Sequence, residues 1–246
     1  MRIESLDPRI SVISRRFANV RKIIAVMSGK GGVGKTLVAT TSALILAREG
    51  HKVGLLDLDM HGPSCHIVLN VQALMPREEK GIIPPQVHGV RFMSIEYYAR
   101  GSPLPLRGSE VSNAILELLA ITRWPSLDYL IIDMPPGTGD EILDLLWLVK
   151  RSEALIICTP SKLALSTVRR LAVLLKSLGA PILGIIENMR TEATSLITEL
   201  AEESGIRYLG WTPYDPNVEK CIGDPRKLLM TDFAKKLAEI VMSSMR

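Results

Sequence analysis

The stretch KIIAVMSGKGGVGKT, residues 22–36, joins a short apolar run to a glycine-rich loop and the start of a helical pattern. Its last eight residues, Gly29–Thr36, match G-x-x-x-x-G-K-[ST] and stand between a predicted strand and a predicted helix, which is the context this pattern requires. Glycines let backbone N–H groups converge on phosphate oxygens, and the helix that follows adds the positive end of its dipole. We therefore expect this loop to bind the phosphates of a nucleotide.

Two side chains of the loop and one outside it have predicted roles beside the phosphates. Lys35 is expected to reach the β- and γ-phosphates, and the Thr36 hydroxyl to bind Mg²⁺. Asp133 ends another apolar run, where a carboxylate can hold the same Mg²⁺, because hard cations prefer oxygen ligands. The predicted phosphate-binding set is Gly29, Lys30, Gly31, Gly32, Val33, Gly34, Lys35, Thr36 and Leu37.

The base of the nucleotide is predicted from a later segment. The chain lacks the Asn-Lys-x-Asp string that accepts hydrogen bonds from guanine, and it offers Asn188, whose amide can both donate to and accept from an adenine edge. Residues 212–218, with Pro213 and Asp215, are expected to cover the other face of the base. The predicted cofactors are therefore ATP and Mg²⁺.

Apolar runs like the first recur along the chain, and most are followed by helical periodicity. Because they do not alternate with polar residues, they suit strands buried on both faces of a parallel sheet. The fold class we predict is α/β: a doubly wound, mostly parallel sheet flanked by helices. The predicted strands are 22–27, 52–58, 129–134, 154–158, 182–186 and 208–211, and the predicted helices are 36–49, 163–178 and 231–246.

Two segments stand outside this alternation. Residues 1–20 form a partly apolar, partly basic arm, so we predict an N-terminal arm over 1–20 and a single nucleotide-binding domain over 21–246. The spacing of Ile3, Leu6, Ile10, Ile13 and Phe17 predicts an apolar stripe, which either docks a partner or packs on the domain. Proline-rich residues 70–109 are expected to be irregular, with at most one short strand near 90–95.

Composition limits the function classes. The chain has 246 residues and a formal charge of 30 − 26 = +4 that is dispersed rather than clustered, so we expect no nucleic-acid partner. Its three cysteines are far apart and form no disulfide framework, which favours a reducing cytoplasm. Apolar stretches are too short to cross a bilayer, and the C-terminal segment is too weakly basic for a membrane-targeting helix, so no stable membrane association is expected.

The motifs together resemble those of the MinD/Mrp/ParA ATPases. SGKGGVGKT (28–36) is similar to their deviant Walker A motif, DLDMHGPS (57–64) to the switch I of the Mrp branch, and IDMPPGTGD (132–140) to its switch II. The resemblance covers about residues 22–246. It implies a P-loop ATPase that closes as a homodimer with ATP sandwiched between subunits. It further implies that Lys30 acts across the interface and that Asp59 orients the attacking water.

Each of the two implied roles has an alternative from the residues alone. Lys30 could be a solvated lysine, because Lys35 already supplies the charge that the phosphates need. Asp59 could cap the next helix rather than act on water. Asp57, two residues earlier, is expected to support the end of its strand.

The chain departs from the Mrp pattern after Asn188. Mrp-type iron–sulfur carriers have a Cys-x-x-Cys pair there, whereas residues 190–199 are RTEATSLITE. On this ground the chain resembles the archaeal-type HypB branch, which implies nickel insertion into [NiFe] hydrogenase with a HypA-type metallochaperone as partner. The alternatives are an iron–sulfur cluster carrier of the Mrp type, a MinD-like positioning ATPase and a DNA-partitioning ATPase.

A small group of potential metal ligands lies at the end of switch I. His61, Cys65 and His66 carry the imidazole and thiolate groups that suit nickel or zinc. Cys65 could equally be a small buried hydrophobic residue, so metal binding and packing both remain open.

Overall fold

A computed structural model describes residues 7–72, 74–99, 101 and 106–245 of the chain. Its centre is an eight-stranded sheet with the strand order β10-β9-β8-β1-β7-β2-β6-β5. All neighbouring strands pair in parallel except β5, which is antiparallel to β6. The predicted mostly parallel sheet is confirmed. The strands are β1 (Val20–Met27), β2 (Val53–Asp57), β5 (Gln86–Val87), β6 (Val90–Ser94), β7 (Leu127–Asp133), β8 (Ser152–Cys158), β9 (Ile182–Arg190) and β10 (Tyr208–Pro213).

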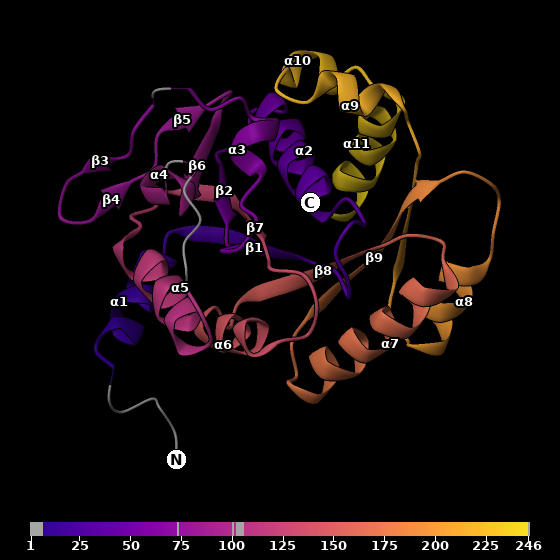
Figure 1. Ribbon diagram of the computed structural model, residues 1–246, viewed down its shortest axis with the longest axis horizontal. Coiled ribbons are helices and arrows are strands. Elements are labelled where there is room, and N and C mark those ends of the chain that lie inside the picture. Colours follow the sequence, from indigo (N-terminus) through magenta and orange to yellow (C-terminus); the bar gives the residue numbers. More distant parts are fainter. Residues whose placement is uncertain (1–6, 73, 100, 102–105, 246) are drawn as a thin grey trace.

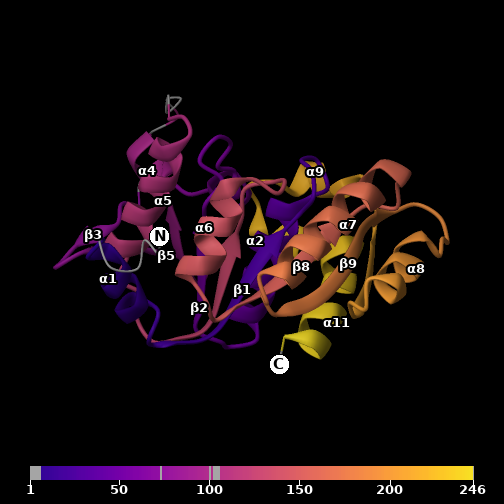
Figure 2. The same ribbon diagram turned by 90° about the horizontal axis from the view of Figure 1, so that it is seen from below.

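Helices cover both faces of the sheet (Figure 1). On one face α2 (Lys35–Arg48) packs beside α11 (Asp232–Ser244), with α3 (Cys65–Val68), α9 (Asn217–Cys221) and α10 (Pro225–Leu228) near them. The other face carries α1 (Arg9–Arg16), α5 (Ser109–Ile121), α6 (Asp140–Leu148), α7 (Lys162–Ser177) and α8 (Leu196–Glu203). In Figure 2, α6 and α7 lie in front of the strands of the sheet. This sandwich explains the apolar strands, because residues such as Ile24, Leu55 and Ile131 are fully buried.

The strand register brings the chemically active residues to one edge of the sheet. β1, β7 and β2 are neighbours in parallel, so their carboxyl ends meet. The phosphate-binding loop leaves the end of β1, and Asp57 and Asp133 end β2 and β7 directly opposite each other. Open α/β sheets place their ligand sites at this edge.

Residues 70–109 contain more regular structure than the sequence predicted. Besides β5 and β6, the described part of this segment holds a small antiparallel pair, β3 (Arg77–Glu78) with β4 (Ile82–Ile83), and the short helix α4 (Glu96–Ala99). The expectation of at most one strand was wrong. β6 lies where it was predicted and extends the main sheet, because it pairs with β2 over its whole length. The other three strands are two residues long, which is too short to show a periodic pattern.

The N-terminal arm packs on the domain. α1 lies against α5 and also contacts α6. Ile13 and Phe17, which belong to the predicted apolar stripe, are 0% and 5% exposed, whereas Ile10 is half-buried. Ile3 and Leu6 lie outside the described residues. Because the described part of the stripe is covered by the protein's own helices, the packing alternative is the one the structure supports.

We expect Ile13→Ala to destabilise the fold by about 2–5 kcal/mol, because it opens a cavity between α1 and the helices beneath it. Chemical denaturation with urea would measure the change in the free energy of unfolding. Arg15→Ala on the exposed side of the same helix is the matched control, with an expected change within about 0.5 kcal/mol. Equal stability of the two variants would show that α1 is not part of the core.

Within the described residues, none of the helices combines the length and the apolar character that crossing a bilayer demands.

Candidate functional site

The loop between β1 and α2 has the backbone that phosphate binding requires. Gly34 stands immediately before α2 in a left-handed conformation with φ +81°, and a Cβ atom there would lie 2.3 Å from the Asn188 amide nitrogen. A Cβ atom on Gly29 would lie 2.7 Å from Thr167 of α7. A side chain at either position would therefore push the loop away from β9 or from α7, so glycine is needed at both for close packing.

Lys35 and Thr36 meet on one carboxylate. Lys35 Nζ lies 2.5 Å from Asp133 Oδ1, and the Thr36 hydroxyl donates to Asp133 Oδ2 at 2.6 Å. Lys35 and Asp133 are 6% and 0% exposed, so this ion pair is shielded from water. The predicted phosphate-binding lysine and the two predicted Mg²⁺ ligands are thus brought together. A hydroxyl and a carboxylate side by side form an oxygen-donor set that fits Mg²⁺.

Asp57 has a role that the sequence indicated only in outline. Its carboxylate accepts backbone hydrogen bonds from Asp59 at 3.2 Å and from Ser64 and Cys65 at 3.1 Å, and Cys65 is the first residue of α3. It therefore holds switch I to the sheet. Burial, reinforced by the nearby charge of Asp133, raises the pKa of Asp57 to about 7.

Asp59 lies in switch I with part of its carboxylate available. Its Oδ1 accepts a hydrogen bond from Gly62 N at 3.0 Å, and the side chain lines the cavity that contains Lys35 and Thr36. Asp59 does not bond to the N-terminus of α3, which Asp57 occupies. Asp59 is therefore not the residue that caps α3. That it orients the attacking water stays a prediction.

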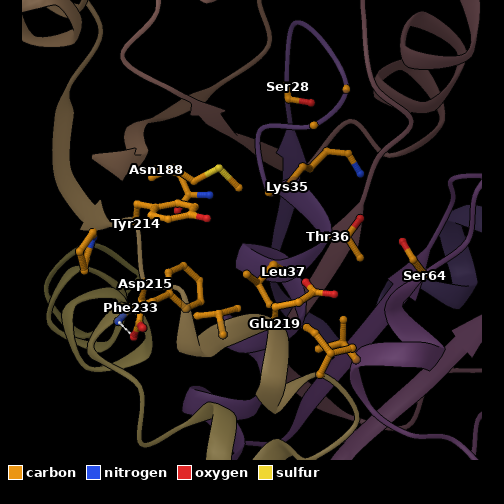
Figure 3. Close-up of a pocket in the computed structure, with 18 of the residues that line it drawn as sticks. Ser28, Lys35, Thr36, Leu37, Ser64, Asn188, Tyr214, Asp215, Glu219 and Phe233 are labelled. Atoms are coloured by element: carbon orange, nitrogen blue, oxygen red, sulfur yellow. Dashed lines mark hydrogen bonds between the residues drawn. The ribbon is translucent and has the colours of Figure 1, made fainter. Parts of the chain in front are cut away.

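The loop opens into a cavity of about 470 Å³ (Figure 3). Its phosphate end includes Ser28, Lys35 and Thr36. Asn188 and Tyr214 lie together on another side, where the base is expected. From the predicted set, the lining contains Gly31, Gly32, Gly34, Lys35, Thr36, Leu37, Asn188, Pro213 and Asp215. Gly29, Lys30 and Val33 belong to the loop but do not line this cavity.

Asn188 is oriented by two neighbours. Its Nδ2 donates to the Val33 carbonyl at 2.8 Å, and its Oδ1 accepts from Thr212 Oγ1 at 2.6 Å. One N–H and one lone pair of the amide are left over, which is what reading an adenine edge needs. Asp215 also lines the cavity, and its carboxylate accepts hydrogen bonds from the backbone of Asn217, Asp232 and Phe233, so it fixes the starts of α9 and α11.

The three potential metal ligands at the end of switch I do not converge. His61 is exposed, whereas Cys65 is fully buried with its Sγ 3.6 Å from Asp133 Oδ2. His66 lines a separate cavity with Phe92 and Tyr97. Within the described residues, the thiol is grouped with two carboxylates, Asp57 and Asp133, and not with the histidines. Burial raises the pKa of the Cys65 thiol well above its usual value, so it behaves as a packed side chain.

Several lining residues were not named as site residues from the sequence, and two of those outside the quoted motifs, Tyr214 and Glu219, carry polar groups. Tyr214, 59% exposed, stands at the base end of the cavity, and Glu219 projects into it from α9 (Figure 3). Neither belongs to the motifs quoted above. The signal for Tyr214 was present, because it lies between Pro213 and Asp215 in the segment expected to cover the base. Glu219 had no sequence signal, since its place depends on how α9 turns back over α2.

The site combines a glycine-rich loop before a helix with a lysine and a threonine that bond one strand-end aspartate. These features define a P-loop nucleotide-binding protein. The family model described as ParA, NUBPL iron-transfer P-loop NTPase, matches residues 19–246. The chain belongs to this family.

Two relatives show what the chain is similar to. An iron–sulfur cluster carrier protein of Pseudomonas fragi is 43% identical over 182 residues, which are 72% of this chain and 63% of that protein. A cytosolic Fe–S cluster assembly factor, the Nubp2 homologue of Anopheles gambiae, is 38% identical over 83% of this chain and 87% of its own length. The chain spans about three fifths of the length of the bacterial carriers it matches.

Solved structures agree on the fold. A nucleotide-binding protein of Archaeoglobus fulgidus in complex with ADP is 30% identical, covers 89% of this chain and 92% of its own, and superposes with a TM-score of 0.75. The septum site-determining protein MinD of Pyrococcus horikoshii, solved with Mg-ADP, has a TM-score of 0.68 over 90% of this chain and 95% of its own. At 21% identity the second shows the fold alone, which confirms the MinD/ParA-like architecture.

These comparisons do not support the finer resemblance to the HypB branch. The two relatives are named for iron–sulfur clusters, and neither is named for nickel, hydrogenase maturation or a HypA-type partner. The missing cysteine pair suggested that branch, but overall similarity places the chain beside the iron–sulfur proteins, which was the first alternative.

Proposed function

We propose that the chain is a Mg²⁺-dependent ATPase of iron–sulfur cluster assembly that acts as a nucleotide-driven switch. The observation that carries this proposal is that Lys35, Thr36 and Asp59 line the phosphate end of one cavity. The buried carboxylate of Asp133 is bonded to Lys35 and Thr36 directly behind this lining. The similarity to proteins named for iron–sulfur clusters supports the choice of pathway.

The residues at the phosphate end can each contribute to hydrolysis of the γ-phosphate. Backbone N–H groups of the loop and the Lys35 ammonium bind the phosphates and stabilise charge as the terminal group departs. Asp59 orients a water molecule for in-line attack and accepts its proton. Thr36 and Asp133 would hold Mg²⁺, and the bound ion would neutralise negative charge on the phosphates.

The switch requires that bound nucleotide changes the surface of the protein. Asp57 ties switch I to the sheet through Ser64 and Cys65, and Asp133 accepts hydrogen bonds from Thr36 and Cys65. A phosphate or cation that moves the Asp133 carboxylate therefore also moves its contact with α3. Binding of ATP beside Asp133 would therefore change the position of switch I, the segment that carries Asp59.

We further propose that two copies of the chain close around ATP, with Lys30 reaching the partner's phosphates. Lys30 is half-buried, lies outside its own cavity, and its carbonyl is held by the Ser28 hydroxyl at 3.0 Å. A lysine that lies on the loop but outside the lining of its own ligand site is available to act on another copy.

Lys30→Ala is expected to leave ATP binding nearly unchanged and to lower turnover by about 10²-fold or more, since a charge supplied in trans to the γ-phosphate is typically worth at least that. Phosphate release and sedimentation with ATP would measure turnover and dimer closure. Lys52→Ala, an exposed lysine at the opposite edge of the sheet, is the matched control. Normal turnover and normal dimer closure in Lys30→Ala would return Lys30 to a surface role.

The iron–sulfur cluster is cargo in this proposal, and the cysteines of the chain do not fit the usual way of holding it. A [4Fe–4S] cluster shared by two subunits needs two thiolates from each. Cys65 and Cys158 are completely buried, which leaves only the half-buried Cys221 in each chain. We therefore propose that this ATPase acts on cluster transfer between other proteins and does not carry the cluster on a cysteine pair of its own.

Two measurements on the purified chain test the proposed function. Phosphate release should require both ATP and Mg²⁺. Anaerobic incubation with ferrous iron and sulfide, followed by desalting, should leave no visible absorption band of a cluster on this chain, whereas the Pseudomonas fragi carrier treated in parallel should retain one. An absence of ATP hydrolysis would overturn the enzymatic part, and a stably held cluster would overturn the transfer role.

A further inference from the structure

The middle of the nucleotide cavity has a lining of its own, between the phosphate end and the base end. The residues there come from α2, from α9 and the residue after it, and from α11. Among the described residues of this stretch, Glu219 alone is charged, and Figure 3 shows its carboxylate extending from α9 toward Leu37. In Figure 3, Leu37 and Glu219 lie between Thr36 and Tyr214, and Val218, Ile222 and Phe233 also line the cavity.

Glu219 is uncommitted, unlike the other acidic side chains of the cavity. Asp215 accepts four hydrogen bonds, from the backbone and side chain of Asn217 and from the backbone of Asp232 and Phe233. Asp59 accepts one from Gly62. The Glu219 carboxylate forms no hydrogen bond or ion pair with any described residue, so both of its oxygens are available to a ligand.

The backbone beneath Glu219 is firmly placed. Asp215 bonds the first residue of α9 at 2.9 Å and the first residue of α11 at 3.0 Å, so one carboxylate ties the two helices together. Val218 of α9 and Ile222, the residue after α9, line the cavity together with Glu219, whereas Lys220 is exposed and outside the lining. Glu219 is therefore presented by a fixed helix and not by a loose loop.

From this geometry we propose that Glu219 binds the ribose hydroxyls of the nucleotide and makes the site selective for ribonucleotides. The inference rests on the proposed ATP binding. With the triphosphate on the loop and the base at Asn188, the sugar must cross the stretch that Glu219 lines. Vicinal hydroxyls are two donors close together, and a carboxylate is the natural acceptor for such a pair.

The selectivity follows from the charge of the acceptor. A hydroxyl that donates to a carboxylate forms a charge-assisted bond, which is stronger than a neutral one. A deoxyribose lacks one of these hydroxyls, so the Glu219 carboxylate would face a C–H group without a hydrogen bond. The affinity of the protein for a deoxynucleotide should therefore be about ten-fold lower. The apolar neighbours Leu37 and Val218 offer the sugar no alternative hydrogen bond through their side chains.

Calorimetric titration of the full chain with ATP, 2′-deoxy-ATP and 3′-deoxy-ATP tests the proposal. In the wild type at least one deoxy analogue should bind about ten-fold more weakly than ATP. In Glu219→Ala the affinity for ATP should fall to that of the deoxy analogue, whose own affinity should not change. Glu219→Gln, which keeps the shape of the side chain, should show the same loss of preference in weaker form.

Lys220→Ala is the matched control on the same helix, and it should keep the wild-type preference. Equal binding of all three nucleotides to the wild type would overturn the inference while leaving ATP binding intact. A parallel loss of all three in both Glu219 variants would also overturn it, because it would mean that Glu219 supports α9 and not the sugar. A wild type that binds none of them would instead refute the proposed function.

Discussion

Lys35→Ala is expected to remove measurable ATP binding, with a dissociation constant higher by about 10²- to 10³-fold. The lysine is the one cation that lines the phosphate end of the cavity among the described residues, and it is 6% exposed. Its interaction with phosphate would be made out of reach of water, where loss of a charge is costly. Isothermal titration with ATP and Mg²⁺ measures the change directly.

The same substitution has a second effect that must be separated from the first. It leaves Asp133, a completely buried carboxylate, without its ion pair, and removing one partner of such a pair typically costs about 3–5 kcal/mol of stability. A double variant, Lys35→Ala with Asp133→Asn, removes both charges and should recover much of that stability. It should still fail to bind ATP. Recovery of binding in the double variant would show that Lys35 acts on the fold and not on phosphate.

Much of the fold was predictable because burial on both faces leaves a strong signal in the sequence. The runs that became β1, β2, β7 and β8 are continuous and apolar, and each ends within two residues of its predicted position. Residues 70–109 had such a signal only near 90–95, where β6 lies. The pairing of β6 with β2 is a long-range contact, and the two-residue strands around it are held by their partners and not by their own composition.

The candidate site, like the fold, has residues that the sequence predicts and residues that it does not. Loop residues Lys35 and Thr36 and the strand-end Asp133 belong to local motifs, so their convergence is predictable from the sequence. The role of Asp57 is not, because it depends on where the chain after switch I returns to begin α3. Glu219 likewise reaches the cavity only through the packing of α9, which Asp215 directs from outside any motif.

Asp59→Asn should bind ATP nearly as well as the wild type and hydrolyse it about 10²- to 10⁴-fold more slowly. The substitution is conservative in shape. The amide oxygen of the new side chain can still accept the hydrogen bond that Gly62 N donates at 3.0 Å, so switch I keeps its turn. The other carboxylate oxygen becomes an amide nitrogen, which cannot take a proton from the attacking water. The expected change therefore falls on turnover and not on affinity.

Phosphate release at saturating ATP gives the turnover of Asp59→Asn, and titration calorimetry with the same preparation gives its affinity. Asp128→Asn is a matched control, because that carboxylate accepts a hydrogen bond from the Lys52 backbone at 2.9 Å, at the far edge of the sheet from the site. Unchanged turnover in Asp59→Asn would transfer the role on water to another carboxylate of the site. Asp133 would be the next candidate for this role. Both of its carboxylate oxygens are already bonded, to Lys35 and Thr36, whereas Asp59 uses one oxygen for Gly62, so Asp59 is the favoured residue.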